Sequence, residues 1–147
     1  QFIYLKQFLP DSASKQAYDV MIKKAEYMKR NVTSTEINKD SMLPGLTMAY
    51  INDMINKGPQ KLHTVLLKKP ALFIQGERDY QVPMSEFELW KNTLQKSCCA
   101  TFKSYQKLNH LLMEGDGLSQ PTEYQKPNNI PEYVVNDITN WIKQQSK

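Results

Sequence analysis

The sequence predicts an α/β fold in which two or three parallel strands are flanked by helices, with further helices upstream. Three segments carry this prediction: a continuous apolar run from Ala71 to Gln75, a helical pattern from Ser85 to Lys96, and an alternating pattern from Ala100 to Gln106. A continuous apolar run is typical of a parallel strand that is covered on both faces. Strand, helix and strand in this order predict a parallel crossover unit.

The N-terminal segment, residues 1–6, contains an apolar run over residues 2–5 that is rich in strand-forming residues. This run predicts either a strand of the core or the start of a hydrophobic loop. Pro10-Asp11-Ser12 then interrupts the chain and offers a helix cap. From about Ser14 to Arg30, apolar residues recur at spacings of three and four, which predicts an amphipathic helix.

Two more helices are predicted before Pro70, one from Leu46 to Asn56 and a shorter one from Gln60 to Leu67. Three successive helices without a strand are unusual within a strictly alternating α/β fold. Residues 7–68 are therefore interpreted as a helical insertion that precedes residues 69–147.

The C-terminal segment begins with a predicted loop from Leu111 to Pro131 that is rich in glycine, proline and asparagine. A loop of this length is uncommon in compact domains and indicates a functional role. Pro131 is well placed as the first residue of a helix. Apolar residues at Val134-Val135, Ile138 and Trp141-Ile142 give that helix one apolar face.

Composition bounds the class of protein. A chain of 147 residues suits one domain, and a content of 40% hydrophobic and 23% charged residues is typical of a globular protein. The net charge of +4 comes from scattered lysines, which favours a solvated surface over a nucleic-acid site. No apolar run approaches the roughly 20 residues of a membrane span. The compartment is left open.

Neither a metal nor a cofactor is predicted. Cys98 and Cys99 are the only cysteines, and adjacent cysteines rarely pair with each other. Two cysteines at this spacing do not make a zinc site. No glycine-rich phosphate loop follows any predicted strand, which argues against a small nucleotide-binding domain.

Two motifs carry a family resemblance. The run from Leu72 to Asp79, Leu-Phe-Ile-Gln-Gly-Glu-Arg-Asp, together with Val82-Pro83, resembles the acid-bearing strand and turn of the α/β-hydrolase family. Asn109-His110 resembles the histidine loop of that family. The resemblance extends from about residue 65 to the C-terminus. It implies a Ser-His-Asp hydrolase of the esterase or peptidase-like branch, acting on carboxylic esters or related small acyl compounds.

The resemblance implies that Asp79 is the acid of the triad and His110 its base. In such a triad the histidine accepts the proton of the nucleophile and the carboxylate orients the imidazole. Each residue follows a predicted strand, so both loops are expected at the same edge of a parallel sheet. Glu77 and Asp116 are rival acids, and His63 is the rival histidine.

The resemblance also assigns roles to the larger segments. It implies a partial α/β-hydrolase fold in which residues 7–68 are the helical lid and residues 69–147 are the C-terminal part of the core. The alternative is a plain helical subdomain without a gating role. Five methionine and tyrosine residues on these helices would be core residues in most proteins, but in a lid their exposed parts would line an acyl pocket. They are Met21, Tyr27, Met28, Met48 and Met54.

No residue of the chain matches the nucleophile motif. None of the nine serines lies in Gly-x-Ser-x-Gly, and the nearest segment, from Gly117 to Pro121, has one glycine and follows no strand. Cys98 and Cys99 follow a helix and lack this turn as well. We therefore expect a C-terminal fragment of a serine hydrolase that is inactive alone.

The alternative function is a binding or scaffolding module that keeps the half-fold without chemistry. A sheet of two or three strands leaves an unpaired edge, which predicts association of the chain with itself through that edge.

Overall fold

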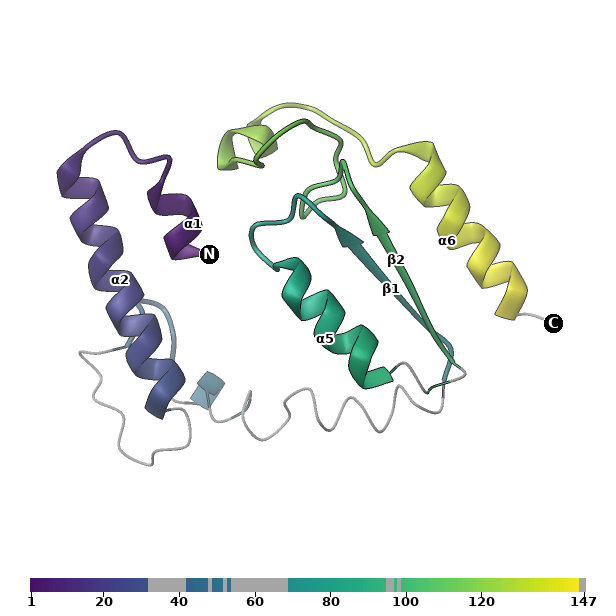
Figure 1. The fold of residues 1–147 in the computed structure, drawn as a ribbon, viewed down its shortest axis with the longest axis horizontal. Helices are drawn as coiled ribbons and strands as arrows, with labels where there is room; N and C mark the ends of the chain where they lie inside the picture. Colours follow the sequence, from purple (N-terminus) through teal and green to yellow (C-terminus); the bar gives the residue numbers. More distant parts are fainter. Residues whose placement is uncertain are drawn as a thin grey trace. The chain divides into compact units, whose positions relative to one another are not determined.

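The computed structural model of the protein forms two compact units, Gln1–Leu62 and His63–Lys147, and each is considered by itself (Figure 1). The structure describes residues 1–31, 42–47, 49–51, 53, 69–94, 97 and 99–145. None of the helices among these residues is long and apolar enough to cross a membrane.

The first unit begins with a short helix rather than a strand. α1 runs over Phe2–Lys6, so the strand expected within residues 1–6 is wrong. A short apolar run fits either structure, and here its contacts with a second helix favour the helix. α2 spans Ser12–Asn31 and confirms the predicted amphipathic helix. Phe2 meets Tyr18 edge to face, and Lys6 forms an ion pair with Asp19.

The start of α2 is capped by Asp11. Its carboxylate accepts hydrogen bonds from the backbone N–H of Ser14 at 2.7 Å and from the Ser14 hydroxyl at 2.8 Å. These bonds satisfy a donor that the first helical turn leaves without a partner. The cap predicted within Pro10-Asp11-Ser12 is therefore confirmed.

The remaining described part of the first unit contains a small core. Met42 and Ile51 are buried there, and Tyr27, Met28 and Leu46 pack against them. Tyr27 and Met28 thus serve as packing residues in this structure. Residues 49–51 and 53 are helical, which agrees with part of the second predicted helix. Most of the other residues of that predicted helix lie outside the described residues. The same holds for Met48, Met54 and the helix predicted from Gln60 to Leu67.

The second unit is built on two parallel strands. β1 spans Ala71–Gly76 and β2 spans Ala100–Tyr105. Ala71 lies opposite Ala100 and Gly76 opposite Tyr105, so the strands run together over their whole length. The helix α5, Met84–Leu94, connects them and confirms the predicted crossover unit.

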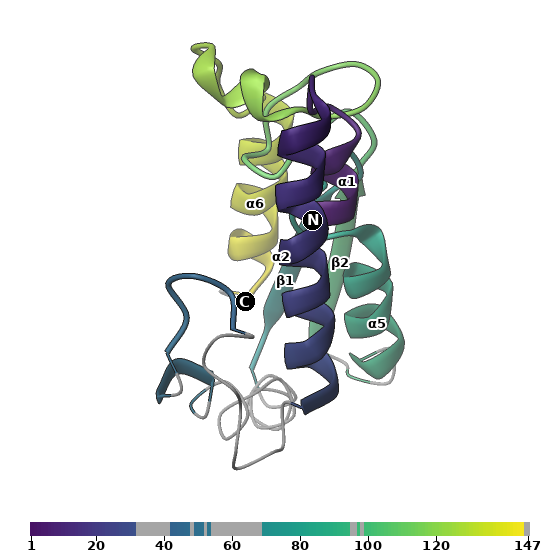
Figure 2. The same cartoon turned by 90° about the vertical axis from the view of Figure 1, so that its left-hand side faces the viewer.

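Helices cover both faces of this sheet. On one face Phe73 stacks on Phe102 at 4.7 Å between ring centroids, and α5 adds Phe87 and Trp90 to this aromatic layer. The C-terminal helix α6, Glu132–Gln145, lies on the opposite face, as Figures 1 and 2 show. There its fully buried Val134 joins a core made with residues of β2 and the loop after it. Burial on both faces explains why β1 is a continuous apolar run.

The segment between β2 and α6 is more ordered than the loop that was expected. Leu108 and Glu114 form an isolated antiparallel bridge, and a 3-10 helix, η2, spans Pro121–Gln125. α6 begins at Glu132, so the helix starts one residue later than the start at Pro131 that was expected. The segment therefore folds back over the ends of the two strands.

Candidate functional site

Asp79 lies in the turn that follows β1, and its carboxylate has a hydrogen-bond partner on each oxygen. Its backbone N–H donates to the carbonyl of Gly76 at 3.1 Å and closes the turn. Oδ1 accepts hydrogen bonds from the N–H groups of Gln81 and Val82 at 2.8 and 2.9 Å. Oδ2 accepts one from Nε2 of Gln75 at 3.1 Å. These three donors fix the carboxylate in one orientation.

His110 lies in a tight turn after β2 that Asn109 builds. The N–H of Asn109 donates to the carbonyl of Met113, and its Oδ1 accepts from the N–H groups of Leu111 and Met113 at 3.0 and 3.1 Å. Leu112 has a φ of 58°, a conformation that is uncommon for a residue with a side chain. The hydrogen bonds of Asn109 therefore hold a strained turn in place.

The two loops bring Asp79 and His110 into direct contact. Nδ1 of His110 lies 2.8 Å from Oδ2 of Asp79. The carboxylate side chain is 5% exposed, whereas the imidazole side chain is 37% exposed. When Nδ1 carries the proton and donates to the carboxylate, Nε2 is the ring nitrogen that can accept a proton. The pair can therefore act as an oriented base at a partly open surface.

Gly76 allows this approach. A Cβ atom at this position would lie 2.3 Å from the carbonyl oxygen of Leu108 and 2.6 Å from that of Asn109. Any larger side chain would push the histidine loop away from the end of β1. In addition, the N–H of Arg78 donates to the carbonyl of Leu108 at 3.0 Å, which joins the two loops through their backbones.

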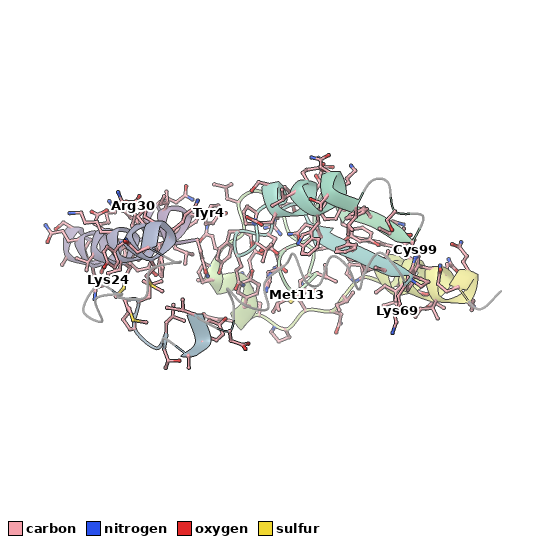
Figure 3. The ribbon with its side chains drawn as sticks, turned by 90° about the horizontal axis from the view of Figure 1, so that it is seen from below. Tyr4, Lys24, Arg30, Lys69, Cys99 and Met113 are labelled. Carbon is pink, nitrogen blue, oxygen red and sulfur yellow. The ribbon has the colours of Figure 1, made fainter. Side chains whose placement is uncertain are left out.

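This meeting point lies at one end of the sheet. Figure 3 shows Met113, from the histidine loop, far along the sheet from Lys69 and Cys99, which precede the two strands. This arrangement agrees with the prediction that the loops of Asp79 and His110 open at the same edge of the parallel sheet. Carboxyl ends of parallel strands are where open α/β sheets place their ligand sites.

A second polar cluster lies beside the pair. The carboxylate of Glu123 in η2 accepts hydrogen bonds from Arg78, Asn109 and Ser119. Burial by itself would raise the pKa of Glu123, but the hydrogen bonds from Asn109, Arg78 and Ser119 outweigh it and hold the pKa below its ordinary value. Glu123 is therefore ionised at neutral pH and forms an ion pair with Arg78.

Comparison with known proteins adds one relative. No protein-family profile matches the chain, and no solved structure gives a significant match. Among curated proteins, Esterase EstD of Thermotoga maritima is 32% identical to the chain over 107 residues. The chain is similar to an esterase. The match covers 73% of this chain and 26% of the relative, so the chain spans about a quarter of the length of the curated relative that it matches.

This similarity supports an esterase-like relationship, and the structure supports a small α/β arrangement. The rival acids make other contacts. The carboxylate of Glu77 accepts a hydrogen bond from the Ser104 hydroxyl at 2.7 Å, and Asp116 contributes its backbone carbonyl to Arg78. His63, the rival histidine, lies outside the described residues. Among the residues that the structure describes, no three histidine, cysteine or acidic side chains are grouped so that they could hold a metal ion.

A hollow of about 300 Å³ lies on the face of the sheet that α6 covers, between α6 and the strands. Several of its polar side chains bind one another. Lys103 forms an ion pair with Asp137, and the Tyr105 hydroxyl donates to the same carboxylate at 2.8 Å. Trp141 Nε1 donates to the Thr101 hydroxyl at 3.1 Å. Burial and the Asp137 carboxylate both raise the pKa of Tyr105, so its hydroxyl stays a donor. These contacts attach α6 to the sheet.

Sequence reasoning missed the residues that support the pair. Gln75, Arg78, Asn109 and Glu123 were not predicted as site residues. Arg78 directly precedes Asp79, and Asn109 directly precedes His110. This position in the sequence could have indicated Arg78 and Asn109 as supporting residues. Glu123 had no such signal, because it lies in the segment predicted as a structureless loop.

Proposed function

We propose that the chain supplies the acid and the base of a Ser-His-Asp triad in an α/β-hydrolase that acts on carboxylic esters or related small acyl compounds. The 2.8 Å contact between His110 Nδ1 and Asp79 Oδ2 carries this proposal. A buried carboxylate next to a partly exposed imidazole is the arrangement that a triad requires. The similarity to Esterase EstD supports the same class of reaction.

In the proposed reaction, His110 Nε2 accepts the hydroxyl proton of a serine as that serine attacks the ester carbonyl. Asp79 holds the imidazole through Nδ1 and stabilises the imidazolium that forms. His110 then donates the proton to the leaving alcohol. A water molecule repeats the sequence on the acyl-enzyme, with His110 again acting as the base.

The nucleophile is proposed to lie on a segment outside these 147 residues. No serine of the chain lies in the Gly-x-Ser-x-Gly motif that places a nucleophile on a strand-to-helix turn. On this proposal the chain alone hydrolyses no ester, because covalent catalysis requires the missing hydroxyl. Residues 7–68 are proposed as the lid of the same enzyme, and residues 69–147 as the C-terminal part of its core.

The test uses the intact protein that unites the chain with a nucleophile segment, with a p-nitrophenyl ester as substrate. Asp79→Asn keeps the size of the side chain but removes its charge, so kcat is expected to fall about 10⁴-fold. His110→Ala is expected to lower kcat on the order of 10⁶-fold. His63→Ala and Asp116→Asn serve as controls for the rival residues and are expected to retain wild-type kcat.

Retention of full esterase activity by both Asp79→Asn and His110→Ala would show that the site assignment is wrong. A loss in His63→Ala or Asp116→Asn instead would move the site to the rival residue. An intact protein that binds acyl compounds without hydrolysing them would favour the binding-module alternative.

A further inference from the structure

A partly buried polar network joins the loop that carries Asp79 to the loop that carries His110. It starts at Arg78, whose side chain is 8% exposed. Its Nε donates to the carbonyl of Gly117 at 2.8 Å, and its two terminal nitrogens donate to the carbonyls of Lys107 at 3.4 Å and Asp116 at 3.2 Å. One guanidinium thus binds three carbonyls on both sides of the histidine turn.

The network continues through Glu123. One carboxylate oxygen, Oε1, accepts from Arg78, and the other, Oε2, accepts from Asn109 Nδ2 at 3.0 Å and from the Ser119 hydroxyl at 3.1 Å. Asn109 and Ser119 are almost completely buried. Such donors need acceptors, because a buried polar group without a partner is costly.

Asn109 completes the path to the imidazole. While its Nδ2 donates to Glu123, its Oδ1 accepts from the N–H groups of Leu111 and Met113. The amide therefore has partners on both its nitrogen and its oxygen, and all three partners follow His110 in the chain. Rotation of this amide would break these three hydrogen bonds at once, so its orientation fixes the turn.

We propose that Arg78, Glu123 and Asn109 are positioning residues that set the place of the His110 imidazole relative to Asp79. The proposal rests on the proposed function in so far as this pair is catalytic. Arg78 is the neighbour of Asp79 along the chain, and Asn109 is the neighbour of His110. Glu123 bridges the two, so a change at η2 reaches the pair without touching either member.

Glu123→Gln is the sharpest variant, because it keeps the shape of the side chain. Both carboxylate oxygens accept hydrogen bonds, so an amide must turn its NH₂ group toward a donor on one side. In the intact protein with a p-nitrophenyl ester, kcat is expected to fall about tenfold while KM stays within about twofold, because the change disturbs the imidazole rather than a substrate contact. Arg78→Lys is expected to behave in the same way, since one ammonium group cannot replace a planar fork of donors.

Asp137→Asn is the matched control. It weakens another part-exposed ion pair of the same unit, the one with Lys103 on the face covered by α6. Its melting temperature is expected to fall while kcat stays at the wild-type value. Equal kcat in Glu123→Gln, Asp137→Asn and the wild type would overturn the proposal and leave the network a purely structural role.

A measurement on the 147-residue chain separates this proposal from the proposed function. The Nδ1 proton of His110, hydrogen-bonded to a carboxylate, gives a downfield proton resonance that is assigned by its loss in His110→Ala. We expect this resonance to broaden or disappear in Glu123→Gln and in Arg78→Lys, and to persist in Asp137→Asn. Its persistence in the first two variants would contradict positioning, whereas full activity of Asp79→Asn would contradict the catalytic role alone.

Discussion

At the residue scale, Gly76 decides whether the two loops of the candidate site can meet. Gly76→Ala would place a Cβ atom 2.3 Å from the carbonyl oxygen of Leu108, and a backbone atom cannot swing aside as a flexible side chain can. We expect the free energy of unfolding to fall by about 2–3 kcal/mol, the upper part of the range for overpacked sites. Denaturant unfolding of the chain, followed by circular dichroism, measures the loss.

Gly117→Ala is the control for this prediction. Gly117 has a φ of +64°, but a Cβ atom there meets no heavy atom within 4 Å. Its substitution should therefore cost only the backbone strain, about 1 kcal/mol. Equal losses for the two variants would show that the histidine loop can move away from an added Cβ atom at little cost. Gly76 would then not be needed for the close approach of this loop to the end of β1.

Residue-scale prediction from the sequence succeeded in part, and the reason is physical. The structure agrees with the expectation that Asp79 and His110 lie at the same edge of the sheet, because each follows a strand and the ends of parallel strands meet there. Gln75 and Glu123 were missed because their partners depend on side-chain positions that no spacing rule encodes. Gln75 reads as part of a buried strand, yet its amide binds Asp79 and the carbonyl of Val82.

At the scale of elements, α6 is attached to the sheet by one side of its surface. Val134 is fully buried, whereas its neighbour Val135 is 49% exposed. Val134→Ala removes two buried methyl groups and should lower the free energy of unfolding by about 2 kcal/mol. Val135→Ala makes the same change in composition and helix propensity, but should stay within about 0.5 kcal/mol of the wild type.

Both variants can be measured by thermal unfolding of the chain. Equal losses for Val134→Ala and Val135→Ala would mean that the buried and the exposed side of α6 contribute equally to stability. The packing of α6 on β2 would then add little to the free energy of unfolding. The contrast matters for the candidate site, because Val134 packs in the same cluster as Leu108, which precedes the histidine turn.

Elements with long, periodic patterns were predicted well, and short ones were not. α2, α5 and α6 each have an apolar face that the sequence reveals over several turns. The segment of α1 is five residues long, and its composition favours a strand. Its helical form depends on contacts with α2, including the Phe2–Tyr18 ring contact, which lie beyond local propensity.

At the scale of the whole molecule, the described residues form a sheet of two strands, and its edges bear on how the chain behaves in solution. The N–H of Ala71 donates to Cys99 and that of Glu77 to Tyr105. Because backbone groups alternate along a strand, the N–H groups of Leu72 and Ile74 face away from β2. No other described strand pairs with them. Such an edge is a template for a further strand.

We therefore expect the chain to associate with itself as its concentration rises, through this edge of β1. Sedimentation velocity over a range of concentrations should show a growing fraction of dimer or larger species. Hydrogen exchange then tests the surface: the amides of Leu72 and Ile74 should gain protection with concentration, while those of Thr101 and Lys103, which face β1, should not change. A chain that stays monomeric, or that associates without protecting Leu72 and Ile74, would show that the edge is not the contact. In the proposed enzyme the same edge would pair with a strand from the rest of the core. The unpaired edge and the missing nucleophile would then have the same cause, because both the partner strand and the serine would lie on the proposed segment outside these 147 residues.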